Sequence, residues 1–123
     1  MHDVVALGEL LIDFTTQSTD SDGYPTMAAH PGGAPANFLA AIAKFGGKAA
    51  LLGKVGTDTF GKLLTDTLRK AGIETKGLVA SDEVFTTLAF VTLDENGDRE
   101  FAFARKPGAD TQLRFDELNL SII

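Results

Sequence analysis

The alternation of apolar runs with helical patterns over the first 72 residues constrains the fold more than any other feature of the chain. Apolar runs in Asp3–Glu9 and Lys48–Val55 have the composition of strands buried on both faces. A helix is expected after each, first over Pro35–Phe45 and then after Asp58, which can cap it. Strand, helix, strand and helix with short connections predict an α/β fold, a parallel sheet flanked by helices.

Both expected helices carry one apolar face. In the first, Phe38, Ile42 and Phe45 recur at helical spacing, and Leu39 and Ala41 broaden the face that they form. The second has a stripe of the same kind at Phe60, Leu64, Leu68 and Ala71. These side chains are predicted to pack against the sheet. The segment between the first strand and the first helix is polar and turn-rich over residues 15–25, which predicts a loop followed by a short strand at Thr26–Ala29.

The pattern changes after residue 85. Thr86–Leu93 and Arg99–Ala104 are β-prone runs, and the five residues between them include Asn96-Gly97. Because both residues of an Asn-Gly pair tolerate positive φ, this pattern predicts a β-hairpin. Phe115–Ile123 has the composition of a further helix or a connector.

Composition excludes several classes of protein. The 123 residues are enough for one compact domain, and the absence of cysteine excludes a disulfide framework and a thiol nucleophile. Seventeen acidic and 11 basic residues are scattered without a basic stripe, so no nucleic-acid partner is expected. No apolar run approaches the ~20 residues that cross a membrane, so no membrane partner is expected. His2 and His30 stand too far apart to suggest a metal site.

A glycine pair, Gly32-Gly33, stands directly before the first helix, whose first turn carries Asn37. Glycine permits a sharp turn and close approach by another molecule, and Pro35 suits the first helical position. The free N–H groups of a helix start carry partial positive charge. This pattern suits a cradle for a hydroxyl-rich or anionic small molecule, and equally a plain strand-to-helix turn.

Two other positions could contact the same molecule. Asp13 follows the first apolar strand, at the edge where open parallel sheets bind ligands. Its carboxylate could accept hydrogen bonds from two sugar hydroxyls, or it could be a solvated loop residue. On the expected hairpin, Phe101, Phe103 and Arg105 share one face. They could cover a sugar's C–H face and bind its oxygens, or the rings could pack under the sheet while the arginine reaches water.

A second glycine-containing segment, Gly56–Leu63, satisfies the pattern G-x-x-x-x-G-K. A phosphate-binding loop of this type needs Ser or Thr after the lysine, and this chain has Leu63. Asp58 would also bring negative charge to the place where phosphates rest. The segment is therefore expected to serve packing, and an unrelated nucleotide-binding domain is the weaker interpretation.

Four segments in this order resemble the ribokinase-like (phosphofructokinase-B type) carbohydrate kinases, most closely their fructokinase branch. The segments are Gly8–Asp13, His30–Gly47, Gly56–Gly61 and Arg105–Asp110. The resemblance implies that residues 1–123 are the N-terminal part of a single ribokinase-like domain, a partial fold without its C-terminal half. It also implies a small β-sheet lid formed by residues of approximately 10–30 and 85–105. The fructokinase branch is indicated by Ala34, where a ribokinase is expected to have lysine.

The resemblance implies a set of substrate-binding residues. In the family, the aspartate and asparagine of these motifs bind sugar hydroxyls, and the glycine pair approaches the sugar and bends as the lid closes. An aromatic side chain and an arginine of the lid help to hold the substrate. The corresponding residues in this chain are Asp13, Gly32, Gly33, Asn37, Phe90, Phe103 and Arg105.

The implied activity is transfer of the γ-phosphoryl group of ATP to a sugar, with fructose expected. The family's G-A-G-D block, which holds the catalytic base, and its N-x-x-E block are absent from this chain. The sites for ATP and Mg²⁺ are thus expected outside it, and residues 1–123 alone should have no kinase activity. A homodimer formed through the lid is also implied, and a cytoplasmic location is expected because the absence of cysteine is compatible with a reducing compartment.

Two alternatives stay open. Because Arg105 could pair with a carboxylate, the parent enzyme could be a 2-keto-3-deoxygluconate kinase or another sugar kinase. The chain could also be a non-catalytic module for sugar binding or dimerisation.

Overall fold

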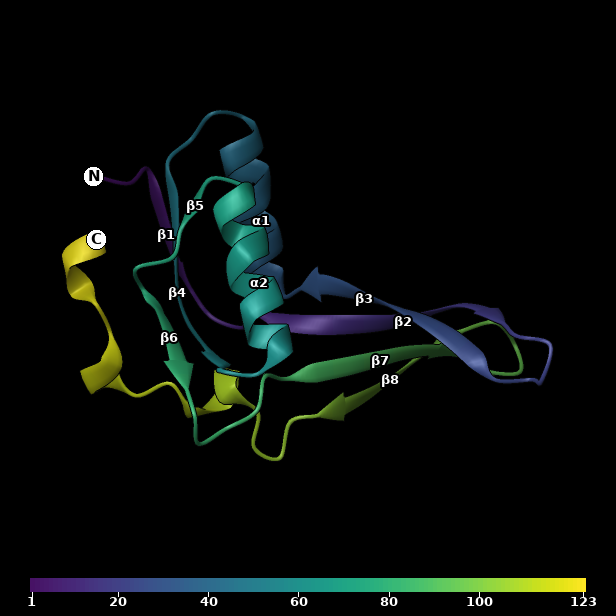
Figure 1. The fold of residues 1–123 in the computed structure, drawn as a ribbon. Helices are drawn as coiled ribbons and strands as arrows, with labels where there is room; N and C mark the ends of the chain where they lie inside the picture. Colours follow the sequence, from purple (N-terminus) through teal and green to yellow (C-terminus); the bar gives the residue numbers. More distant parts are fainter.

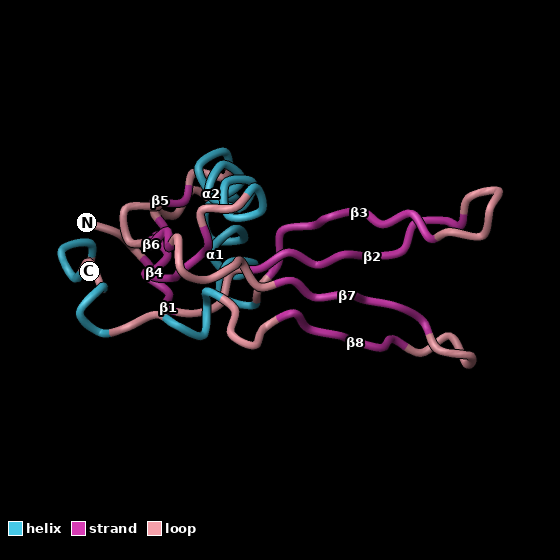
Figure 2. The backbone as a smooth tube through the Cα atoms, turned by 60° about the horizontal axis from the view of Figure 1, so that its bottom comes forward, coloured by secondary structure: helices cyan, strands magenta, loops and turns pink.

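Two four-stranded sheets make up the computed structural model, which describes residues 1–123 (Figure 1). The body sheet contains β1 (Val4–Leu7), β4 (Ala49–Gly56), β5 (Ile73–Glu74) and β6 (Leu78–Ser81). The arm sheet contains β2 (Leu11–Thr19), β3 (Pro25–Gly32), β7 (Leu88–Leu93) and β8 (Arg99–Ala104). The arm sheet projects from the body as a long extension (Figure 2).

The body sheet is parallel throughout, which confirms the predicted α/β class. Strand β4 pairs with β1, β5 and β6, and all eight of its residues are buried. Helices α1 (Ala34–Lys44) and α2 (Thr59–Lys70) lie together on one side of this sheet (Figure 1). Alternate residues of β4 point to opposite faces of the sheet, so its apolar run can fill a core on both sides.

The main core lies between the two helices and the body sheet. Leu39 of α1 and Leu64 of α2 are fully buried there against Leu51 and Val55 of β4. On the other face of β4, a smaller cluster forms around Ala50, Leu52 and Ile122. None of the helices is long and apolar enough to span a membrane.

The predicted buried face of α1 is wrong in part. Phe38 is half-exposed, Phe45 is 90% exposed and Ala41 is also exposed. Leu39 is buried as predicted, and Ala36 faces the core as well. The apolar residues of this helix are spread around its axis, so helical spacing alone fits more than one face. The small side chain of Ala36 lets the helix lie close to the sheet, and Phe45 is already at the C-cap, where the chain turns away.

The arm sheet has the strand order β3-β2-β7-β8. The predicted hairpin is confirmed, since β7 and β8 pair antiparallel, while β2 and β7 pair parallel. The loop expected over residues 15–25 is wrong, because β2 continues to Thr19 and only residues 20–24 form the turn. Threonine is common in strands, and Thr15, Thr16 and Thr19 each pair with a residue of β3.

The last segment forms short 3₁₀ turns in place of a regular helix. They are η1 (Ala109–Gln112), η2 (Phe115–Glu117) and η3 (Leu120–Ile122). The buried Lys54 of β4 holds this segment against the sheet, with its Nζ 2.7 Å from a carboxylate oxygen of Glu117. The same Nζ donates a hydrogen bond to the Gln112 carbonyl oxygen at 3.1 Å.

Candidate functional site

The strand registers give the arm sheet two chemically different faces. Asp13 of β2 lies opposite His30 of β3 and Ala89 of β7, and Ala89 in turn lies opposite Phe103 of β8. Paired residues of neighbouring strands share a face of the sheet. We call this side the Asp13 face. Its next row consists of Ala28, Thr15, Val91 and Phe101.

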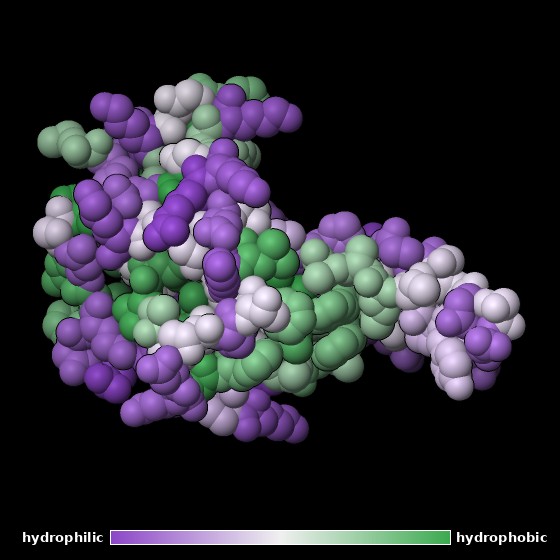
Figure 3. All heavy atoms as spheres, in the orientation of Figure 1, coloured by the Kyte–Doolittle hydropathy of each residue, from purple (hydrophilic) through white to green (hydrophobic).

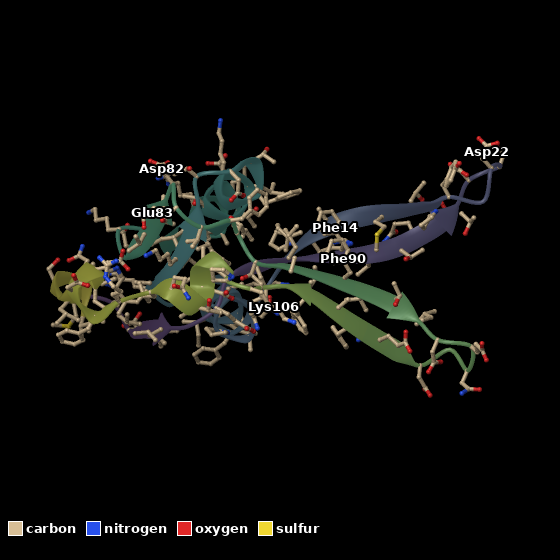
Figure 4. All side chains as sticks on the ribbon, turned by 90° about the horizontal axis from the view of Figure 1, so that it is seen from below. Phe14, Asp22, Asp82, Glu83, Phe90 and Lys106 are labelled. Atoms are coloured by element: carbon tan, nitrogen blue, oxygen red, sulfur yellow. The ribbon has the colours of Figure 1, made fainter.

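The opposite face of the arm sheet is aromatic and turns towards the body. Phe14 of β2 and Phe90 of β7 lie side by side, with stacked rings whose centroids are 5.2 Å apart (Figure 4). Phe14 also meets Phe60 of α2 edge to face at 5.5 Å. The structure therefore does not bring Phe90 together with Asp13 and Phe103. This corrects the predicted grouping. Phe90 directly follows Ala89 along β7, so its side chain points to the face opposite Asp13.

Asp13 lies directly against the glycine pair. A Cβ atom at Gly32 would collide with the Asp13 carboxylate, so only glycine leaves room for that side chain. Gly33 has a φ of +112°, and a Cβ there would lie 2.6 Å from the Glu9 carbonyl oxygen. Burial, and then the negative charge of Glu9, raises the pKa of Asp13 above its usual value, whereas His30 acts in the opposite direction.

Helix α1 starts immediately after this bend. Its N-cap residue Gly33 has no side chain to accept a hydrogen bond, and a carboxylate oxygen of Glu9 accepts one from the Ala34 N–H at 3.4 Å. Negative charge at a helix start is favourable. The Asn37 N–H donates to the Gly33 carbonyl oxygen at 3.0 Å, while the exposed Asn37 side chain has no hydrogen-bond partner in the chain. Its amide is available to a ligand.

Asp13 and Asn37 line different hollows. An open groove of about 820 Å³ runs along the Asp13 face and is also lined by Thr15, Val91 and Phe101. Asn37 lines a hollow of about 280 Å³, together with Gly32 and side chains of α2. The two side chains thus flank the glycine pair. The chain by itself does not form the single pocket expected for them.

Arg105, just past the end of β8, belongs to a cluster of charged groups beside the Asp13 face. Its Nη2 atom lies 2.8 Å from a Glu9 carboxylate oxygen and 2.9 Å from one of Asp110. The guanidinium carbon is 5.1 Å from the centre of the Phe103 ring, a cation–π arrangement. The second carboxylate oxygen of Asp110 accepts a hydrogen bond from the Thr87 hydroxyl. Burial alone would lower the pKa of Arg105, but its bonds to Glu9 and Asp110 raise it above the usual value.

Sequence reasoning missed Glu9 and Asp110 as members of this cluster. Each lies in one of the four motif segments, and that was the only signal available for them. Glu9 and Arg105 are 96 positions apart, so only the folded chain brings them together.

The Gly56–Leu63 segment does not have the geometry of a phosphate-binding loop. The Asp58 carboxylate accepts hydrogen bonds from the N–H groups of Phe60 and Gly61, which confirms its predicted role as the cap of α2. It also accepts bonds from the Thr86 N–H and hydroxyl. Burial would raise the pKa of Asp58, but these hydrogen bonds outweigh burial and lower it. No group of three or more acidic or histidine side chains could hold a metal ion.

The chain is similar to known carbohydrate kinases along its whole length. Residues 1–122 match the protein family described as pfkB family carbohydrate kinase. Probable fructokinase-3 of Arabidopsis thaliana is 47% identical over 122 residues, which cover 98% of this chain and 35% of that protein.

Solved structures agree with this match. The crystal structure of fructokinase from Xylella fastidiosa superposes with a TM-score of 0.91 at 38% identity, covering 97% of this chain and 37% of that one. A structure of fructokinase from the same organism with bound ATP gives a TM-score of 0.88 at 37% identity, with 97% and 35% covered. The chain therefore spans little more than a third of the length of these relatives.

Proposed function

Because this chain belongs to the pfkB family of carbohydrate kinases, we propose that it is the sugar-binding and lid portion of an ATP-dependent kinase that phosphorylates fructose. We refer to the longer protein that would contain it as the full-length kinase. One observation carries the proposal: the Asp13 carboxylate is held against the glycine pair, on the sheet face that also bears Phe103.

Each proposed sugar contact has a chemical reason. The Asp13 carboxylate can accept hydrogen bonds from two adjacent hydroxyls, and the free amide of Asn37 can donate and accept at the helix start. The ring of Phe103 can cover the apolar C–H face of the sugar. Bending at Gly32-Gly33 would bring the Asp13 and Asn37 sides of the glycine pair onto one ligand, with the arm sheet closing as a lid.

ATP would supply the phosphoryl group, and Mg²⁺ would neutralise the charge of its phosphates. Asp58 already occupies the N–H groups at the start of α2, and no group of three or more acidic or histidine side chains could hold a metal ion. We assign both sites to the part of the full-length kinase outside residues 1–123. We accordingly expect no kinase activity from the 123-residue chain.

We further propose that two copies of the kinase pair through the arm sheet and that the kinase works in the cytoplasm, where ATP is supplied. Phe101 and Phe103 are about half-exposed on the Asp13 face. Apolar residues also cover much of the arm where it leaves the body, whereas its tip is polar (Figure 3). Exposed apolar area of this kind is typical of interaction surfaces. Sedimentation velocity of the full-length kinase should give a dimer, and a monomer at micromolar concentration would contradict the pairing.

The activity is tested with a panel of sugars. The full-length kinase is assayed with ATP and fructose, glucose, ribose or 2-keto-3-deoxygluconate, and the 123-residue chain serves as the inactive control. We expect the highest kcat/KM with fructose. Preference for 2-keto-3-deoxygluconate would favour the runner-up enzyme, and phosphorylation of none of these sugars would refute the proposed function.

A further inference from the structure

The contacts of Arg105 inside the chain occupy the nitrogen that both of its paired donor arrangements share. One nitrogen, Nη2, bonds the carboxylates of both Glu9 and Asp110. A second nitrogen, Nε, is buried and has no partner. Arginine recognises a free carboxylate best with two parallel N–H groups from neighbouring nitrogens. That paired arrangement is no longer available here, so the remaining Nη1 can offer only single hydrogen bonds.

The charge of Arg105 is also more than balanced. Glu9 and Asp110 each carry a negative charge within hydrogen-bond distance of it, and Asp110 is almost fully buried, with 2% of its side chain exposed. Glu9 also raises the pKa of Asp13, so the negative charge extends onto the proposed sugar site. A sugar acid reaching Arg105 would meet repulsion from these carboxylates, whereas a neutral sugar would find hydrogen-bond acceptors and a single donor.

We propose that Glu9 and Asp110 are specificity-determining residues that make this site select uncharged sugars over sugar acids. They do so by neutralising Arg105 and by occupying the N–H groups that a substrate carboxylate would need. The inference rests on the proposed function, because it requires the sugar to bind beside Arg105. It goes beyond the proposed function because sugar-kinase activity alone does not determine whether the substrate is an uncharged sugar or a sugar acid.

The test compares two substrates in variants of the full-length kinase. Glu9→Gln and Asp110→Asn each remove one negative charge and keep the size of the side chain. We expect each to raise the ratio of kcat/KM for 2-keto-3-deoxygluconate to kcat/KM for fructose by about tenfold, on the scale of one unscreened like charge nearby. The gain should shrink as ionic strength rises, because salt screens the repulsion.

Asp22→Asn is the matched control. It also removes one negative charge, but Asp22 lies in the turn at the tip of the arm, far from Lys106, the neighbour of Arg105 (Figure 4). This variant should leave the substrate ratio unchanged at every ionic strength. A purely structural role of Glu9 or Asp110 would lower kcat/KM for both substrates together and leave their ratio unaltered.

An unchanged ratio in a folded Glu9→Gln variant would overturn the inference while leaving the proposed function intact. This variant keeps the test sharp even if Asp110→Asn does not fold, since Glu9 is 38% exposed and its amide can still accept from the Ala34 N–H. Failure of the wild-type kinase to phosphorylate fructose would instead refute the proposed function, and the inference with it.

Discussion

The body and the arm are both four-stranded sheets, yet they are stabilised in different ways. Every residue of β4 in the body is buried, whereas every residue of β8 in the arm is exposed. Hydrogen bonds between strands are present in both sheets, so the difference lies in what covers them. Buried apolar area dominates stability, which therefore resides in the body. The arm is left with surface that can bind a ligand or a partner.

The candidate site lies where the two regions join. Glu9 lies between β1 of the body and β2 of the arm, and Asp13 is in the first part of β2. The glycine pair connects β3 of the arm to α1 of the body. Arg105 connects β8 to Glu9 across this junction. Polar contacts of this kind can rearrange at lower cost than a packed core, which suits a lid that opens and closes.

The largest expected effect separates function from stability. Asp13→Ala in the full-length kinase should reduce kcat/KM for fructose at least about a thousandfold, because the site loses the acceptor that orients the hydroxyls. Asn37→Ala should act in the same direction. The melting temperature should not fall with Asp13→Ala, because folding raises the pKa of this carboxyl and so disfavours its charged form. Near-native kinetics in both variants would contradict the roles proposed for Asp13 and Asn37.

The second effect tests where stability resides. Leu51→Ala should lower the free energy of unfolding by about 3 kcal/mol, because it opens a cavity in the main core. The matched variant Leu93→Ala, at an arm residue that is 69% exposed, should change it by less than about 0.5 kcal/mol. Urea unfolding of the two variants measures both values. Equal losses would mean that the arm contributes to stability as much as the body does.

A smaller effect concerns the start of α2. Asp58→Ala should cost about 2 kcal/mol at pH 7, because it removes a helix cap together with two bonds to Thr86. Folding lowers the pKa of Asp58, so its contribution is complete above the ordinary carboxyl pKa and is lost as pH falls through the lowered value. Unfolding measured at several pH values should show wild type and variant converging in acid. If the difference in unfolding free energy between wild type and variant does not change with pH, the Asp58 carboxylate is not the source of the lost stability.

Features that depend on local pattern could be predicted from the sequence. The apolar run of β4, the Asn96-Gly97 hairpin and the cap at Asp58 all follow from neighbouring residues. Features that depend on the environment could not. Residues 15–19 form a strand although their pattern is polar, because pairing with β3 decides their structure.

The same distinction applies to the candidate site. The sequence motif predicts the bend at Gly32-Gly33. Its tight contact with Asp13 could not be predicted, because it depends on how β2 and β3 pair in the folded chain. The separation of Phe90 from Phe103 depends on strand register, which a sequence does not reveal when both faces carry apolar residues. The contacts of Arg105 with Glu9 and Asp110 arise only when β8 reaches the body.

The account depends most on where the sugar lies, and a crystal structure of the full-length kinase with fructose measures this directly. We predict fructose hydroxyl oxygens within about 2.6–3.2 Å of the Asp13 carboxylate, on the same side of the arm sheet as Phe103. Fructose bound against Phe14 and Phe90 on the opposite face, or bound without contact to Asp13, would contradict it.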